Sequence, residues 1–258
     1  MTQRLLFYRR TVSKWIPDRS ASILVVAGGT SDRDVFRELG FSAVVISNID
    51  RDARATDVAP YSWSQQNAEA LGYRDGEFDY VVVHAGLHHC RSPHRGLLEM
   101  YRVAGKAVIA FEPPDNLLVR IMQRIRLAQV YEYTAVRCNE GRCGGADNSD
   151  IPNYIYRWTE HEIEQVIGSY APCTRHRYQY AYDSDEPTRE FIAESASKRA
   201  LVGLAKPAYR LWSWCFPTQQ NLFAFMINKP VVPRDLQPWL VMDGKEIRFN
   251  PRWNRELR

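Results

Sequence analysis

The chain has 258 residues, 45% of them hydrophobic, so it can bury a complete core, and its net charge of +4 gives no reason to expect a nucleic-acid partner. The five cysteines are odd in number and irregularly spaced, which argues against a disulfide framework and predicts reduced thiols in a cytoplasmic protein. No apolar run reaches the ~20 residues of a membrane span, and the N-terminal apolar stretch is too short for a signal peptide.

Residues 1–20 are predicted to form a helical extension that precedes the main domain. Apolar side chains recur there at helical spacing, at Leu5, Leu6, Tyr8, Val12 and Trp15. Such a helix either packs on the domain or contacts a substrate.

A strand, a glycine-containing turn and a helix follow. Residues 22–27 are a buried-strand run, and Val35, Phe36 and Leu39 continue as a helix that ends at Gly40. A nucleotide cofactor needs this arrangement, because the turn lets a ligand approach the backbone and the helix N-terminus offers N–H groups. The candidate cofactor-binding residues of the turn are Ala27, Gly28, Gly29, Thr30, Ser31 and Asp32.

The second predicted strand, residues 43–46, leads into a polar loop. Asp50 lies about twenty residues past the glycine turn, where an acidic side chain accepts hydrogen bonds from ribose hydroxyls in doubly wound folds. Asn48 is a weaker candidate for the same role. A solvated loop acid or a helix cap is the alternative for Asp50.

Residues 67–106 predict a βαβ unit. A turn at 74–76 precedes the strand Tyr80 to Val83, a polar loop covers 84–94, and a helix leads to a further strand at 107–111. The phrases NAEALGYRDGEFD, GLHHC and EMYRV follow one another in this block.

In their order and spacing these phrases resemble the class I S-adenosylmethionine (SAM)-dependent methyltransferases, in the branch of the methyltransferase domain family 11. The resemblance implies an α/β, Rossmann-like doubly wound sheet of about seven strands with helices on both faces, and S-adenosyl-L-methionine as cofactor. On the family pattern Asn67 and Ala68 meet the adenine, and His84, directly after the fourth strand, joins the cofactor-binding residues.

The chain departs from the family at the glycine turn. The family usually shows an acid and three alternating glycines, and here Val25 stands at the acid while Ala27, Gly29 and Ser31 stand at the glycines. Alanine and serine preserve the close backbone approach if their φ angles are negative. For the missing acid three outcomes are open: Asp32 or Asp34 substitutes, the affinity for SAM falls, or the protein no longer methylates.

A general base is needed only if the acceptor must lose a proton. His84 is the first candidate, because it follows its strand directly, and Glu112, before Pro113 and Pro114, and His88 are the others. For His88 and His89 a helix cap or a backbone hydrogen bond is the competing interpretation. No metal is expected, because the histidines at 84, 88, 89 and 94 lack an acidic companion at HExxH-type spacing. The acceptor is expected to be a small molecule or a saccharide, methylated on oxygen.

The remaining sequence predicts an amphipathic helix over 115–135, a lid-like loop over 139–150 and a helix after the capping box of Thr159 and Glu162. The sixth and seventh strands are expected near 175–182 and 221–228, separated by an insertion at about 184–218. The main domain thus covers 21–230, and a basic tail over 231–258 is expected to tuck onto it through Trp239, Phe249 and Trp253.

Two other classes of protein stay open. A scaffold that kept the fold and lost its cofactor would explain the altered turn. A dinucleotide-dependent oxidoreductase shares the strand, turn and helix, but the incomplete GxGxxG pattern speaks against it. Nothing in the sequence decides between a monomer and a homo-oligomer.

Overall fold

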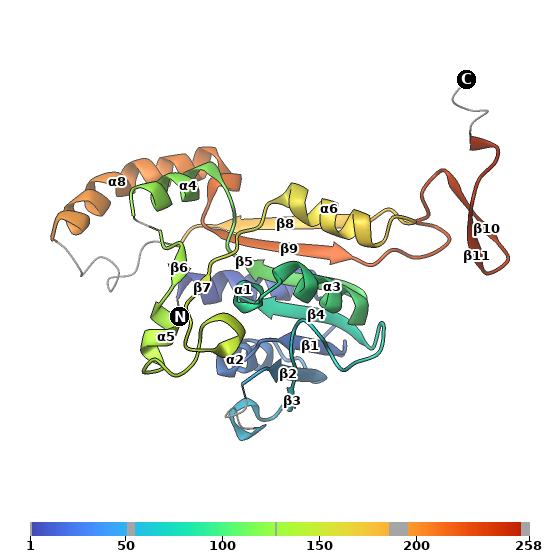
Figure 1. Ribbon diagram of the computed structural model, residues 1–258, viewed down its shortest axis with the longest axis horizontal. Coiled ribbons are helices and arrows are strands. Elements are labelled where there is room, and N and C mark those ends of the chain that lie inside the picture. Colours follow the sequence, from blue (N-terminus) through green and yellow to red (C-terminus); the bar gives the residue numbers. More distant parts are fainter. Residues whose placement is uncertain (1, 51–54, 127, 186–195, 254–258) are drawn as a thin grey trace.

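The computed structural model describes residues 2–50, 55–126, 128–185 and 196–253 (Figure 1). Its centre is a seven-stranded sheet in the order β3-β2-β1-β4-β5-β9-β8, in which the first five strands are parallel and β9 is antiparallel to both neighbours. The strands are β1 (Ile23–Val26), β2 (Val44–Asn48), β3 (Ser62–Gln65), β4 (Phe78–His84), β5 (Ala104–Glu112), β8 (Arg177–Asp183) and β9 (Leu222–Asn228).

Helices cover both faces of this sheet (Figure 1). Helices α1 (Gln3–Trp15) and α2 (Thr30–Glu38) pack on one face, and α3 (Pro93–Val103) and α6 (Glu160–Tyr170) pack on the other. Successive side chains of a strand point to opposite faces, so in β1 Ile23 and Val25 join the core under α1 and α2, while Leu24 and Val26 join the core under α3 and α6. This two-sided burial explains the continuous apolar runs of the sequence.

The predicted doubly wound fold is confirmed, including the positions of the sixth and seventh strands at β8 and β9. Strand β3 is the third strand that the numbering of the fourth strand implied, but its position was not located, because Ser-Trp-Ser-Gln carries little strand signal at the edge of the sheet. Strand β2 runs two residues further than predicted and ends at Asn48. The predicted helix near the N-terminus is α1, and its apolar face, including Tyr8 and Trp15, belongs to the core.

The single helix expected over 115–135 was wrong. Helix α4 (Leu117–Arg124) ends early, Arg126 adopts a left-handed backbone with φ of +61°, and the chain then forms β6 (Tyr131–Glu132) and α5 (Thr134–Cys138). Strand β6 pairs with β7 (Asn153–Tyr154), so a long-range pairing overrides the local helical periodicity.

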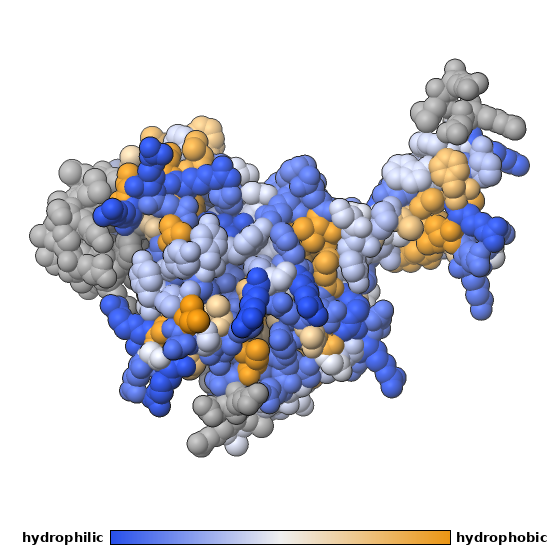
Figure 2. Space-filling model, viewed as in Figure 1, coloured by the Kyte–Doolittle hydropathy of each residue, from blue (hydrophilic) through white to orange (hydrophobic). Residues whose placement is uncertain are grey.

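The tail was also predicted wrongly in part. Leu236 is buried against the domain, but β10 (Leu240–Asp243) and β11 (Glu246–Phe249) form a hairpin that projects away from the body (Figure 1). Trp239 packs on Trp253 within the projection, and Phe249 is half exposed. The space-filling view shows apolar side chains gathered on this hairpin (Figure 2).

The insertion at about 184–218 contains α8 (Ala196–Cys215), which lies at the same end of the molecule as α4 (Figure 1), while residues 186–195 of the insertion are outside the described residues. Within the described ranges, no helix combines the length and the apolar character needed to cross a membrane. All five cysteines are free thiols, as expected.

Candidate active site

A pocket of about 280 Å³ opens at the carboxyl ends of β1, β2 and β4, where open α/β sheets bind ligands. Ala27, Asn48 and Ala85 come from the ends of these three strands. Residues 66–68, after β3, form a second wall, and Gly86 and Cys90 extend the wall after β4. Burial raises the pKa of the Cys90 thiol to about 12, so this cysteine is no nucleophile at neutral pH.

The turn after β1 is backbone-strained. Ala27 has φ of +52° and Ala85, after the neighbouring strand, has φ of +57°. The condition of a negative φ is therefore not met at Ala27, and a left-handed L-residue costs on the order of 1–2 kcal/mol. The two turns press together, since a Cβ added to Gly86 would lie 2.6 Å from the Cβ of Ala27. Such strain is typical of ligand-binding sites, where the surrounding structure enforces it.

The residues from Gly28 to Asp32 lie behind the pocket wall. A Cβ on Gly28 would come within 2.7 Å of Val25, so glycine is required there by core packing. Gly29 is the N-cap of α2, and Thr30 and Ser31 begin that helix. Val25 itself is fully buried, so the family's acid position faces the core in this chain.

Asp32 and Asp34, the two expected replacements for that acid, are engaged elsewhere. The buried carboxylate of Asp32 accepts from the Tyr8 hydroxyl at 2.9 Å and from the Gly29 N–H at 2.9 Å. Asp34 pairs with Arg33 and Arg37 on the surface. Among the described residues that line the pocket, Asp147 is the one that carries a carboxylate.

The buried position of Asp32 predicts a pH-dependent stability. Burial raises the pKa of its carboxyl to about 6, so the folded chain keeps a proton that the unfolded chain loses near pH 4. The free energy of unfolding should therefore fall as the pH rises from about 4 to 6, by up to about 3 kcal/mol. Asp32→Asn should flatten this slope, because its amide still bonds Gly29 and the Tyr8 hydroxyl can turn to accept. Urea unfolding at several pH values measures the slope, with Asp34→Asn as the control; equal slopes in all three proteins would contradict the assignment.

The end of β2 presents Asn48 to the pocket. The Asn48 amide donates to the Gly28 carbonyl at 3.1 Å and accepts from the Asp50 N–H at 3.1 Å, so it joins the turn after β1 to the loop after β2. Asn48 and Ile49 line the pocket, whereas Asp50 is not part of its wall. Of the two ribose candidates, the geometry favours Asn48.

Asn67 and Ala68, the two residues expected to contact the adenine, line the pocket together with Gln66. The Asn67 side-chain oxygen accepts from the Glu69 N–H at 2.9 Å and keeps a second lone pair for a ligand donor.

The loop over 139–150 forms one side of this pocket. Gly144, Gly145, Asp147 and Asn148 line the pocket from this loop, and Ala135 of α5 joins them. A Cβ on Gly145 would lie 1.9 Å from the Ile151 carbonyl, so the glycine is required for the loop to fold back on itself.

A second pocket of about 350 Å³ adjoins the first and shares Ala85 and His89 with it. Its walls are mixed: Val119 and Met122 of α4 are apolar, whereas Arg4 of α1 and Arg157 are cationic. The Arg157 Nε is buried without a hydrogen-bond partner among the described residues. A polar ligand group in this pocket would satisfy it.

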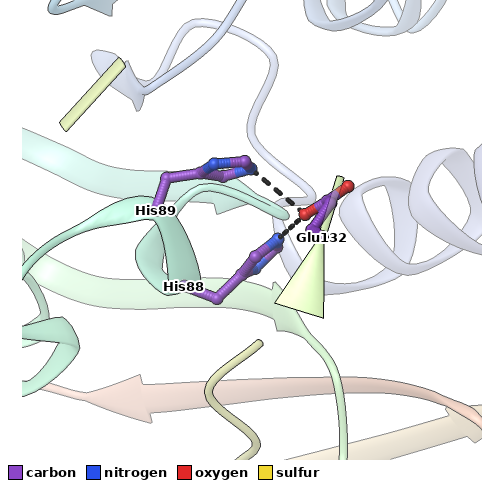
Figure 3. A group of neighbouring side chains, drawn as sticks. All are labelled: His88, His89 and Glu132. Carbon is purple, nitrogen blue, oxygen red and sulfur yellow. Dashed lines mark hydrogen bonds and ion pairs between the residues drawn. The ribbon is translucent and has the colours of Figure 1, made fainter. Parts of the chain in front are cut away.

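A charged network, here called the floor, lies where the two pockets meet. It consists of Glu112, His88, Glu132 and His89. Glu112, at the end of β5, accepts from the backbone N–H groups of Gly86 and Leu87 at 2.9 and 2.7 Å, and its other oxygen lies 2.7 Å from Nδ1 of His88. The Nε2 of His88 lies 3.1 Å from Glu132 of β6, and the Nε2 of His89 lies 3.5 Å from the same carboxylate (Figure 3).

The network sets the protonation of its members. Burial disfavours a charge on His88, but the Glu112 and Glu132 carboxylates outweigh it and raise its pKa to about 9. Burial and the neighbouring His88 lower the pKa of His89. His88 is therefore a cation near neutral pH, whereas His89 is neutral and retains the lone pair of a base.

The structure places the other histidines away from this floor. His84 stacks on Tyr8 with ring centroids 4.3 Å apart and packs edge-on against Phe111, and burial, with the charge of Arg4, lowers its pKa to about 4. It lines an adjoining cavity of about 50 Å³ with Arg4 and Glu112, which shares Ala85 with both pockets, but His84 itself lines neither of those two pockets. His94 pairs with Glu162 at 2.8 Å.

Sequence reasoning missed Glu132, Asp147 and Arg157. The helical periodicity over 115–135 hid Glu132, because it placed that residue on a helix surface. The glycine pair before Asp147 is the local signal that a tight, ordered turn is present.

The strand order, the antiparallel β9 and the pocket beyond the carboxyl ends of β1, β2 and β4 define a Rossmann-like, doubly wound α/β fold. Residues 34–110 match the family model described as "Methyltransferase domain". A ubiquinone/menaquinone biosynthesis C-methyltransferase of Marinomonas sp. (strain MWYL1) is 31% identical over 148 residues, which cover 51% of this chain and 56% of that protein. The chain thus spans little more than half the length of this curated relative.

Solved structures share the fold over nearly the whole chain. A possible histamine N-methyltransferase of Thermotoga maritima has a TM-score of 0.50 at 13% identity, with 88% of this chain and 89% of that chain covered. The cyclase SpnF has a TM-score of 0.51 at 16% identity, with 87% and 80% covered. The family match over residues 34–110 and the 31% identical relative support the expected resemblance to the class I SAM-dependent methyltransferases, and S-adenosyl-L-methionine is the cofactor of that family.

Proposed function

We propose that this protein transfers a methyl group from SAM to a small-molecule or saccharide acceptor, on an oxygen atom. The observation that carries the proposal is the meeting of two pockets at Ala85 and His89. One pocket lies at the nucleotide-binding edge of the sheet, and the other has the mixed polar and apolar walls that fit a hydroxyl-bearing acceptor.

The first pocket fits the cofactor. Small residues line much of this pocket and leave it open, and larger side chains at these positions would fill it. They are Ala27, Ala68, Ala85 and Gly86. Asn48 offers amide groups on the ribose side, and Asn67 does so on the adenine side. Asp147 supplies the carboxylate that Val25 lacks and is the candidate partner for the amino group of the methionine end.

Bound SAM supplies a methyl group that is already activated, so the work left to the chain is alignment and exclusion of water. The lid residues 144–148 close one side of the cofactor pocket, and the small Ala85 leaves the junction open. His89, neutral and at the junction, is the group placed to accept the acceptor's proton. His89 therefore replaces His84, His88 and Glu112 as the candidate base. Glu112 and His88 are bound to each other in the floor network.

Titration calorimetry of the purified protein tests the proposal. SAM and S-adenosylhomocysteine should both bind with micromolar affinity, and NAD, as the control ligand, should not. Failure of both sulfur ligands would favour a scaffold that has lost its cofactor, and binding of NAD alone would favour an oxidoreductase.

A further inference from the structure

Three potential metal ligands converge on one point of the floor: the adjacent His88 and His89, and Glu132, which lies 44 residues from His88 in the sequence. The Nε2 atoms of His88 and His89 lie 3.1 and 3.5 Å from one oxygen of Glu132, and the three ligand atoms all lie within 4.8 Å of one another (Figure 3). Two donors bound to a common ion at about 2.1 Å, with angles between 90° and 109°, lie about 3.0–3.4 Å apart. The two spacings to Glu132, 3.1 and 3.5 Å, lie close to this range, so a small movement of the rings would bring all three ligand atoms to a common ion.

The outer contacts of both rings are those of metal-bound histidines. Nδ1 of His88 is held by the buried Glu112 carboxylate at 2.7 Å, which directs Nε2 toward the cluster. The His89 ring has a hydrogen bond to the backbone of Gly145. A carboxylate or carbonyl on the far ring nitrogen fixes the tautomer and the orientation of a ligating imidazole.

Asn153 adds an independent sign of a ligand. It is 3% exposed, it pairs with Glu132 in the β6–β7 ladder, and its amide holds the His88 carbonyl at 3.0 Å. Its side-chain oxygen is buried without a hydrogen-bond partner among the described residues. Buried oxygens without a partner cost free energy, and a water carried by an ion would satisfy this one.

We propose that His88, His89 and Glu132 bind a divalent first-row transition-metal ion, with Zn²⁺ as the reference ion. Two imidazoles and one carboxylate suit Zn²⁺ or Fe²⁺, whereas Mg²⁺ prefers oxygen ligands alone. The ion would displace the proton from Nε2 of His88, since a ligating imidazole nitrogen carries no proton, and its charge would then balance the two carboxylates, Glu112 and Glu132, that face the histidines. The absence of a metal expected from the missing HExxH spacing is thereby revised, since Glu132 lies 44 residues from His88 and only folding brings it close.

Three protein ligands leave coordination positions open, and all three residues line the second pocket. The ion would take an oxygen of the acceptor beside the junction at Ala85 and lower its pKa, so that its proton is lost to solvent water. With the ion bound, this activation would replace proton acceptance by His89, because the Nε2 lone pair of His89 would be used to bind the ion. This second part rests on the proposed methyl transfer, whereas the binding of the ion does not.

Metal binding is tested on the full chain after treatment with a chelator. Calorimetric titration with Zn²⁺ should show one ion per chain, and Co²⁺ should give the visible absorption of a coordinated ion. His89→Gln and Glu132→Gln should each weaken Zn²⁺ binding at least tenfold. His94→Gln is the matched control, because it removes a histidine that pairs with a carboxylate, Glu162, outside the cluster.

Wild-type binding no tighter than that of His89→Gln and Glu132→Gln, or an equal loss in His94→Gln, would overturn the metal site. SAM titrated into the chelated protein separates the two proposals. Binding of SAM without any specific Zn²⁺ site leaves the methyltransferase standing and removes the metal, and a specific Zn²⁺ site without SAM binding does the reverse.

Discussion

Glu112→Ala is expected to lower the free energy of unfolding by about 3–5 kcal/mol, the range found when one partner of a buried ion pair is removed. The Glu112 side chain is fully buried and its carboxylate holds two backbone N–H groups and the ring of His88. Alanine would leave these three donors unpaired in the core, and the loop over 85–90 would lose its anchor. Urea unfolding measures the change.

Two further variants, a control and a double substitution, test whether the loss of stability in Glu112→Ala is specific. Glu140→Ala removes an exposed glutamate that pairs with Arg142 and should change the free energy of unfolding by less than about 0.5 kcal/mol. Glu112→Ala combined with His88→Ala should lose less than the sum of the single losses, because the two side chains share one interaction. Strict additivity, or a mild effect of Glu112→Ala alone, would show that the carboxylate does not anchor the loop.

Asn48→Ala is expected to weaken SAM binding about 10- to 100-fold, which corresponds to about 1.4–2.7 kcal/mol. The Asn48 amide lines the cofactor pocket and ties the turn after β1 to the loop after β2. Its removal takes away a ligand contact and frees the left-handed turn at Ala27. Calorimetric titration with SAM measures the loss, and circular dichroism establishes that the variant is folded.

Asp50→Ala is the matched comparison, two residues along the same loop. The sequence alone assigns the ribose to Asp50 and predicts that this variant abolishes SAM binding. Because the pocket wall contains Asn48 and Ile49 and not Asp50, the structure predicts a loss of affinity for Asp50→Ala smaller than that for Asn48→Ala. A larger loss of SAM affinity in Asp50→Ala than in Asn48→Ala would show that Asp50 makes the ribose contact.

Local patterns were sufficient for the strands of the sheet other than β3. The apolar runs at 22–27 and 80–83 could be buried only in strands covered on both faces, and the strand, glycine turn and helix located the cofactor edge. They failed where the local signal and the long-range pairing disagreed. Residues 115–135 have helical periodicity, yet the chain breaks at Arg126 and pairs β6 with β7.

The sequence by itself determined the doubly wound fold and the neighbourhood of the glycine turn, because backbone turns and strand periodicity depend on residues close together in the chain, and the order of its short phrases indicated the family whose cofactor is SAM. The tertiary structure decided which side chains share the floor of the site. It removed His84 to a packing position beside Tyr8, converted Glu112 and His88 into an anchored pair, and brought Glu132 and Asp147 to the pockets. Contacts between distant segments depend on the packing of whole elements, and no local pattern encodes that packing.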